Sequence, residues 1–529
     1  MKFAIYLSAL LMVSVELTGC QTHITSAASP NGSIHIPNIP SRDFSITDFG
    51  AMADGKTDNG PAIARAIQAC TNAGGGHVII PAGHWFSGPI HLRSRIDFHL
   101  NPGALILFSR NYDDYPLIIG NYEGHQAVIC TSPLSGDQLE DVSITGEGVI
   151  DGQGEAWWPI KKTRVPIEVW NSFVESGGEV DPVSQTWYPT ETWLKEQKPL
   201  AAFRKTNQPL RIQDYQKYRD MLRPPMVCLS NVKHLLLDGV TFRNSPSWNI
   251  HLLYSDDITV RNVTIFNPYY APNGDGIDID SCRNVSLTDS NINAGDDVIC
   301  LKSGRDAEGR LVGRPTEDVT IARCSLGHGH GGIAIGSEMS GGVRNVEVYD
   351  CTFNGTDDAI RLKTVRGRGG VVENINIHDV QMWDIKNACI VLDMYYMVHH
   401  GSSTTNSSIR GAKMNAGGAQ ADEPVAKPLS VTQELPEPIG PGTPQFRRIT
   451  IRNLVCHGAN IAVQLRGLPE LPAQNITIEH ASISSNQGGS IVDADRIWLR
   501  DVHITAPAVP GFEIQNATNV SIEDADVIP

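Results

Sequence analysis

Residues 274–281 read GDGIDIDS, and three later segments repeat this pattern: 296–303 (DDVICLKS), 330–337 (HGGIAIGS) and 357–364 (DDAIRLKT). Aligned on their isoleucines, the four segments alternate apolar and polar residues, which is the period of a β-strand. If they stack as parallel neighbours about 4.8 Å apart, their polar residues gather on one surface. That surface would carry carboxylates, a histidine, an arginine and lysines, so the repeat predicts both a fold and a site.

A second pattern of short apolar strands lies upstream of each of these segments. Two examples are residues 284–287 (NVSL) and 318–321 (DVTI), and the pattern recurs at steps of 21–34 residues between 257 and 377 and again between 448 and 522. This period is typical of a β-solenoid, whereas a propeller blade needs a longer repeat. A solenoid also grows without a second core, which suits a chain of 529 residues. We expect an all-β fold, a single-stranded right-handed parallel β-helix.

One helix is expected, near the start of the chain. Residues 61–70 (PAIARAIQAC) are rich in alanine, begin with proline and end before three glycines at 74–76. Proline in the first turn and glycine after the last are the usual helix boundaries. Because the terminal rung of a solenoid needs a cover, this helix is predicted to cap the N-terminal end.

Two stretches interrupt the repeat. Residues 155–223 hold five of the nine tryptophans, and residues 399–443 are rich in Gly, Ser, Ala and Pro. Both are longer than ordinary connections, and such insertions are often functional. They are either surface loops with a small core of their own or walls that close one end of a cleft. The tryptophans are expected to form loop core, with sugar stacking as the alternative.

The first residues resemble an export signal. Lys2 precedes an apolar run from Phe3 to Val15, and Leu17-Thr18-Gly19-Cys20 resembles a bacterial lipoprotein cleavage box. We expect a signal peptide at 1–20, lipidation of Cys20, a tether at 21–41 and a catalytic domain at 42–529. The protein would be exported and membrane-anchored, in the outer membrane or periplasm. Ordinary cleavage that leaves Cys20 unmodified is the alternative.

Net charge and cysteine spacing limit the classes of ligand and metal that the protein is expected to bind. A net charge of −16 disfavours nucleic acid. No CxxC pair occurs, so no structural zinc is expected, and the site needs no other metal or cofactor. An acidic glycan remains compatible, because a local cluster of Arg and Lys binds carboxylates at short range.

Four short motifs follow one another along the chain: Asn273-Gly274-Asp275, Gly295-Asp296-Asp297, Gly329-His330-Gly331 and Arg361-Leu362-Lys363. Together they resemble glycoside hydrolase family 28, the polygalacturonases, although Gly274 and Leu362 replace the family's usual Thr and Ile. Residues 48–58 and 148–154 also resemble pectin-degrading β-helix enzymes, so the resemblance spans residues 42–529. It implies inverting hydrolysis of α-1,4-galacturonosyl linkages in homogalacturonan.

Cleavage of a glycoside needs one carboxyl to protonate the leaving oxygen and one carboxylate to activate water. Stacked rungs place Asp275 and Asp297 about 5 Å apart. Since three carboxylates this close cannot all ionise cheaply, one pKa should rise. The resemblance implies that Asp296 is the general acid, that Asp275 and Asp297 hold the water, and that His330 tunes Asp296.

Four further residues are expected to bind the sugar. Arg361 and Lys363 alternate onto the site face and suit a galacturonate carboxylate. Asn273 belongs to the first motif, and Tyr396 follows the rung after Arg361.

Four residues outside the motifs are expected to have structural roles. Asp280 and Lys302 are expected to pair across rungs. Asp357-Asp358 falls outside the family's pattern and is expected to form a turn.

Three alternatives stay open at this point. The aspartate cluster could hold calcium in a pectate lyase. The chain could instead be a rhamnogalacturonan hydrolase, or a non-catalytic glycan-binding surface protein on the same scaffold.

Exo action is expected, because the two insertions flank the site along the solenoid and could close one end of the groove.

Overall fold

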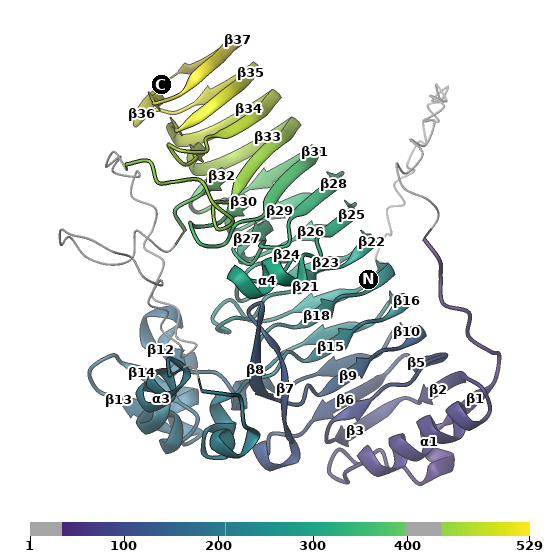
Figure 1. Cartoon of the computed structure of the whole chain (residues 1–529). Helices are drawn as coiled ribbons and strands as arrows, with labels where there is room; N and C mark the ends of the chain where they lie inside the picture. Colours follow the sequence, from purple (N-terminus) through teal and green to yellow (C-terminus); the bar gives the residue numbers. More distant parts are fainter. Residues whose placement is uncertain (1–33, 207, 397–434, 529) are drawn as a thin grey trace, which may run out of the picture. The chain divides into compact units, whose positions relative to one another are not determined.

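The repeated segments stack as parallel strands, in the register that the sequence predicts. Each turn of the chain, called a rung here, adds strands that pair with those of the next rung (Figure 1). Asp278 lies opposite Cys300, Ala334 opposite Arg361, and Gly336 opposite Lys363. These are the columns obtained by aligning the isoleucines, and the parallel β-helix is confirmed.

The computed structural model describes residues 34–206, 208–396 and 435–528. All of them belong to one unit, Ile34–Pro529. The expected signal peptide with Cys20, the first part of the tether and residues 399–434 of the second insertion lie outside the described residues. No helix in the described ranges is long and apolar enough to cross a membrane.

Three ladders of strands form the coil. The site ladder contains β4 (Ile90–His91), β9 (Leu134–Asp137), β15 (Val227–Ser230), β18 (Ile250–Leu253), β21 (Ile277–Asp280), β24 (Ile299–Lys302), β27 (Gly329–Gly336), β30 (Thr356–Lys363) and β32 (Ala388–Asp393). The second contains β1 (Asp43–Ser45), β2 (Gly76–Ile80), β5 (Ile96–Leu100), β10 (Glu140–Gly146), β16 (Lys233–Asp238), β19 (Asp256–Arg261), β22 (Arg283–Thr288), β25 (Thr316–Ala322) and β28 (Val343–Tyr349).

The third ladder contains β3 (Gly83–Ser87), β6 (Ala104–Phe108), β11 (Val149–Asp151), β17 (Thr241–Arg243), β20 (Thr264–Phe266), β23 (Asn291–Asn293), β26 (Ser325–Leu326) and β29 (Thr352–Asn354). Toward the C-terminus the strands are longer and join neighbouring ladders: β31 (Val371–Trp383), β33 (Gln445–Arg466), β34 (Ala473–Val492), β35 (Ala494–Thr505), β36 (Val509–Gln515) and β37 (Thr518–Ile528). One continuous core of aliphatic side chains fills the coil.

The recurring Asn or Asp near the start of several second-ladder strands has a structural reason. Asn284, Asp318 and Asn345 have φ angles of 56°, 59° and 56°, a left-handed conformation that Asn and Asp tolerate better than other side chains. Stacked members bond to each other, since Asn345 Nδ2 donates to Asp318 Oδ1 at 3.0 Å. The recurring Asn or Asp is therefore a turn residue that also links rungs.

The predicted cap is present as α1 (Gly60–Asn72), which buries Ile63, Ala66 and Ile67 against the first rungs. The expectation of a single helix is wrong. The first insertion contains α2 (Ile167–Glu175), α3 (Glu191–Arg204) and the 3-10 helix η5 (Ile212–Met221), and α4 (Asp306–Val312) follows β24. Short helices of this kind are stabilised by tertiary packing more than by local periodicity, which explains why the sequence pattern did not reveal them.

The first insertion folds around its own aromatic core. All five of its tryptophans are buried, as predicted. The insertion also carries a small antiparallel sheet of β12 (Ile160–Lys161), β14 (Thr186–Tyr188) and β13 (Glu179–Asp181). It is fixed to the coil where Trp158 Nε1 donates to the backbone oxygen of Ser245 at 2.9 Å.

Candidate active site

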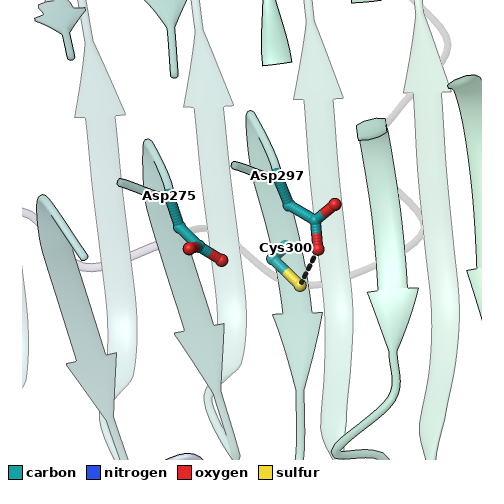
Figure 2. Close-up of side chains that lie close together, drawn as sticks. All are labelled: Asp275, Asp297 and Cys300. Carbon is teal, nitrogen blue, oxygen red and sulfur yellow. Dashed lines mark hydrogen bonds between the residues drawn. The ribbon is translucent and has the colours of Figure 1, made fainter. Parts of the chain in front are cut away.

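The predicted catalytic residues meet at the start of neighbouring strands of the site ladder. Asp275 precedes β21, Asp296 and Asp297 precede β24, and His330 lies in β27; each is at most 4% exposed. One oxygen of Asp275, one of Asp297 and the sulfur of Cys300 lie within 4.8 Å of one another (Figure 2). Adjacent rungs thus bring two carboxylates as close as the strand spacing predicts.

Each of the two carboxylates keeps one buried oxygen that can still accept a hydrogen bond. Oδ1 of Asp275 and Oδ1 of Asp297 are buried and accept no hydrogen bond from a described protein group. Buried acceptors of this kind are expected to bind a water or a substrate hydroxyl. On Asp297 this oxygen faces the next rung, since a Cβ added at Gly331 would lie 2.8 Å from it.

Cations surround Asp297 more closely than Asp275. Lys363 Nζ lies 2.7 Å from Asp297 Oδ2, and Arg361 Nη1 lies 3.7 Å from Oδ1. The nearest cation to Asp275 is the ammonium of Lys302, at 4.0 Å. Burial, followed by the charges of Asp278 and Asp296, therefore raises the pKa of Asp275 well above its usual range. The prediction that one carboxyl of the cluster has a raised pKa is confirmed for Asp275.

Asp296 is paired with His330. His330 Nδ1 lies 3.3 Å from Asp296 Oδ1, and the backbone N–H of His330 donates to the backbone oxygen of Asp296 at 2.8 Å. Burial alone would raise the pKa of Asp296, but the charge and hydrogen bond of His330 outweigh it, with help from Lys363 and Arg361. The pKa of Asp296 is therefore below its usual range.

Lys302 is the hub of a buried network behind the site. Its ammonium lies 3.2 Å from Glu338 Oε2, 3.5 Å from Asp278 Oδ1 and 4.7 Å from the centre of the Trp248 ring. The expected Asp280–Lys302 pair is wrong. The two residues do oppose each other across rungs, but the long Lys302 side chain turns toward the carboxylates of Asp275, Asp278 and Glu338.

Asp280 has a partner of its own. Its Oδ2 lies 3.4 Å from His251 Nε2, and its Oδ1 accepts from the N–H of Gly304 at 3.1 Å. His251 is opposite Asp278 in the register, one rung before the first of the four aligned segments. Extending the alignment by one rung would have found it.

Asp278 is expected to make stability depend on pH. It is fully buried, and burial raises its pKa to about 7 against the opposing charges of Lys302 and His251. Because its folded pKa lies above the ordinary 3.8, its contribution to stability is lost as pH rises from about 4 through 7. Asp278→Asn cannot lose a proton there. Its free energy of unfolding relative to wild type should rise by about 1–3 kcal/mol between pH 5 and pH 8 in urea titrations. A difference that stays constant over this range would contradict the buried titration.

The predicted sugar-binding residues also lie at the site. The Tyr396 ring centre is 4.9 Å from Lys363 Nζ and 5.6 Å from the Arg361 guanidinium carbon. Asn273 Oδ1 accepts a 2.7 Å hydrogen bond from Arg223 Nη2, a buried residue at the end of the first insertion that the sequence did not reveal. The site is thus built partly by the insertion.

The turn role expected for Asp357-Asp358 is wrong, since both residues lie inside β30. Asp358 Oδ2 lies 3.4 Å from Arg361 Nε, and its Oδ1 accepts from the N–H of Ala388 at 3.1 Å. Asp357 Oδ2 lies 3.9 Å from His330 Nε2. Unlike Asp296-Asp297, this pair is held within a strand and supports Arg361 and His330.

A β-hairpin that the sequence did not reveal lies beside the rung before Asp275. It consists of β7 (Leu117–Tyr122) and β8 (His125–Cys130) (Figure 1). Tyr122 stacks on Trp248 with ring centres 5.5 Å apart, on the side of Asp275 away from His330. Two contacts hold the tip of the hairpin. Nη1 of Arg305, the residue before α4, lies 3.2 Å from Glu123 Oε2, and Glu308 of α4 accepts from the N–H of Gln126 at 3.0 Å. We call this element, with Trp248, the hairpin barrier.

The donor set argues against a calcium centre. Calcium prefers six to eight oxygen ligands, whereas the cluster of Asp275, Asp297 and Cys300 includes a thiol. Ammonium groups of Lys302 and Lys363 lie 4.0 and 2.7 Å from its two carboxylates, where a divalent cation would be repelled. These contacts favour a site that works with protein groups alone.

Comparison with known proteins agrees with this geometry. Residues 213–422 match the family model described as glycosyl hydrolases family 28, and residues 44–111 match the model of rhamnogalacturonase A/epimerase, pectate lyase-like proteins. A probable polygalacturonase of Vitis vinifera is 28% identical over 91% of this chain and 81% of its own length. An endo-polygalacturonase of Pectobacterium carotovorum is 26% identical over 75% of this chain and 89% of its own.

A solved structure is also similar, that of a hyperthermoactive exopolygalacturonase from Thermotoga maritima. Its TM-score is 0.71 at 28% identity, and the match covers 89% of this chain and 93% of that one. The four motifs, their stacking on one ladder and these similarities lead to one conclusion: residues 213–422, which hold all four motifs, match glycoside hydrolase family 28.

Proposed function

We propose that this protein hydrolyses α-1,4-galacturonosyl linkages of homogalacturonan from a chain end, with inversion at the anomeric carbon. The observation that carries the proposal is the pair of buried acceptor oxygens on Asp275 and Asp297, beside the Asp296–His330 pair and the cations Arg361 and Lys363. This arrangement supports a water site, a proton donor and a carboxylate-binding group on neighbouring rungs.

The division of labour follows from these contacts. A water held by Asp275 and Asp297 attacks the anomeric carbon and gives its proton to this carboxylate pair. Asp296 donates a proton to the glycosidic oxygen, which leaves as a hydroxyl of the other fragment. In the empty site the positive charges of His330, Lys363 and Arg361 lower the pKa of Asp296. An anionic sugar bound at Arg361 and Lys363 offsets part of that charge, so substrate binding favours transfer of the His330 proton to Asp296.

The hairpin barrier supports exo action. Similar proteins include both endo- and exo-acting enzymes, so the choice rests on the groove. Trp248 leads into β18, the strand before Asp275 in the site ladder, and Tyr122 of the hairpin stacks on it. A spacing of about 4.8 Å leaves room for roughly one sugar unit on that side. The first insertion supports the same edge through Arg223, whereas most of the second lies outside the described residues.

The products released first from polygalacturonate test this proposal. The protein should release mono- or digalacturonate, with a slow fall in viscosity per bond cut. A variant in which residues 121–126 are replaced by Gly-Gly should cut internally, giving mixed oligomers and a faster viscosity drop. A steep viscosity drop with the unchanged protein would contradict exo action. Cleavage of rhamnogalacturonan but not homogalacturonan would favour the related hydrolase, and no new reducing ends on either would favour a binding protein.

Export is part of the proposal. The apolar run after Lys2 and the Leu17–Cys20 segment support a signal peptide at 1–20 and a lipid anchor on Cys20. The lipid-free Cys20→Ser protein should then appear in the soluble fraction of an expressing bacterium. Equal membrane association of both proteins would count against the anchor.

A further inference from the structure

A pocket joins the first insertion to the active site. It is lined by Lys161 and Arg164 from the insertion, by residues 269–272 from the loop before β21, and by Gly295 and His330 from the site ladder. Gly295 is the residue directly before the Asp296-Asp297 pair. A ligand in this pocket would therefore lie next to the atoms of the proposed proton donor.

Packing fixes the position of this pocket. Tyr270 contacts both Trp158 and Phe173 of the insertion edge to face, with ring centres 6.1 Å apart in each case. Ala271 belongs to the same buried aromatic core. The loop and the insertion thus form one packed block, so the side chains that line the pocket are held at a set distance from the site.

The chemistry of the lining suits an acidic sugar. Arg164 Nη1 donates to Tyr269 Oη at 3.3 Å, and its guanidinium carbon lies 5.9 Å from the ring centre. The ammonium of Lys386 lies 4.1 Å from the same ring. No Asp or Glu occurs among the described residues that line the pocket. Clustered cations bind carboxylates, and an aromatic face can carry the apolar side of a sugar ring.

We propose that Lys161 and Arg164 form a second carboxylate-binding subsite, which holds a galacturonate unit adjacent to the scissile bond. This inference rests on the proposed function and deepens it. Arg361 and Lys363 lie on the opposite side of Asp297 from the hairpin barrier and bind one carboxylate. The insertion supplies the groups for another, at the His330 edge. The first insertion is then a substrate-reading element rather than a decoration of the coil.

Binding of trigalacturonate, measured by calorimetry, tests the subsite. The measurement uses the full chain carrying Asp296→Asn, so that the ligand is not consumed. Adding Lys161→Met or Arg164→Gln should raise Kd about ten- to hundredfold, the usual cost of losing one charged hydrogen-bond partner. Lys161→Arg should keep Kd within about threefold, because the charge remains. Lys162→Met is the matched control, since Lys162 is exposed and faces the Trp170 ring at 5.8 Å. It should change Kd less than about twofold.

The outcomes separate this inference from the proposed function. Unchanged Kd in both Lys161→Met and Arg164→Gln, with normal hydrolysis of polygalacturonate by the unsubstituted protein, would overturn the subsite alone. Failure of the unsubstituted protein to cleave polygalacturonate would overturn the proposed function itself. A changed near-UV spectrum of the insertion's tryptophans in Lys161→Met, with equal loss of affinity in Lys161→Arg, would show a packing role and also overturn the subsite.

Discussion

Asp296→Asn is expected to lower kcat on polygalacturonate by about 10²–10⁴-fold, the usual loss when a positioned acid is removed. The amide has nearly the same shape as the carboxylic acid but cannot donate a proton to the glycosidic oxygen. It can still accept the 2.9 Å hydrogen bond from the N–H of Asp297, so the local backbone should be retained. The measurement is kcat from reducing ends at saturating substrate, with far-UV circular dichroism as a check on folding.

The matched control is Asp289→Asn. Asp289 is a surface residue that pairs with Arg323, and their side chains are 40% and 49% exposed. Loss of such a surface pair should change stability by less than about 1 kcal/mol and leave kcat unchanged. A folded Asp296→Asn protein that retains wild-type kcat would remove Asp296 from the mechanism.

Lys302→Met should destabilise the protein by about 3–5 kcal/mol, the cost of removing one partner from a buried ionic group. Lys302 is 4% exposed, and its ammonium lies within 4.0 Å of Asp275, Asp278 and Glu338. Without it, the pKa of Asp275 and of Asp278 should rise further, because Lys302 lowers both. The acidic limb of the pH–rate profile should therefore move to higher pH. Urea unfolding of the same variant measures the loss of unfolding free energy.

A second variant separates lost charge compensation from lost packing. If the cost comes from the uncompensated carboxylates, adding Asp278→Asn to Lys302→Met should recover part of the stability, so the two changes are not additive. Urea unfolding of the two single variants and the double variant gives this coupling. Additive effects, or a loss below about 1 kcal/mol for Lys302→Met, would show that Lys302 does not hold the network together.

The sequence predicts those parts of the structure that follow from the two-residue period of a strand. The alternation predicts Asp278 opposite Cys300 and Gly336 opposite Lys363, because the side-chain period fixes the register once the isoleucines are aligned. The observed register has both pairs. The same period placed Asp275 and Asp297 on adjacent rungs. The meeting of the predicted site residues is thus a consequence of register.

Side-chain direction and long-range contacts could not be predicted in this way. Lys302 lies opposite Asp280, as expected, but four flexible bonds let its ammonium reach Glu338 instead. The β7–β8 hairpin has no repeat of its own, and only its contacts with Trp248 and Arg305, far along the chain, give it a role. Arg223 shows the same limit, because its partner Asn273 lies 50 residues away.

The most direct test of the central claim is proton NMR of the first product formed from polygalacturonate. A water held by Asp275 and Asp297, opposite a proton donor at Asp296, should give galacturonate as the β-anomer before mutarotation, with no unsaturated sugar and no requirement for calcium. Appearance of the α-anomer first, or of an unsaturated product whose formation stops with chelator and returns with calcium, would contradict the account.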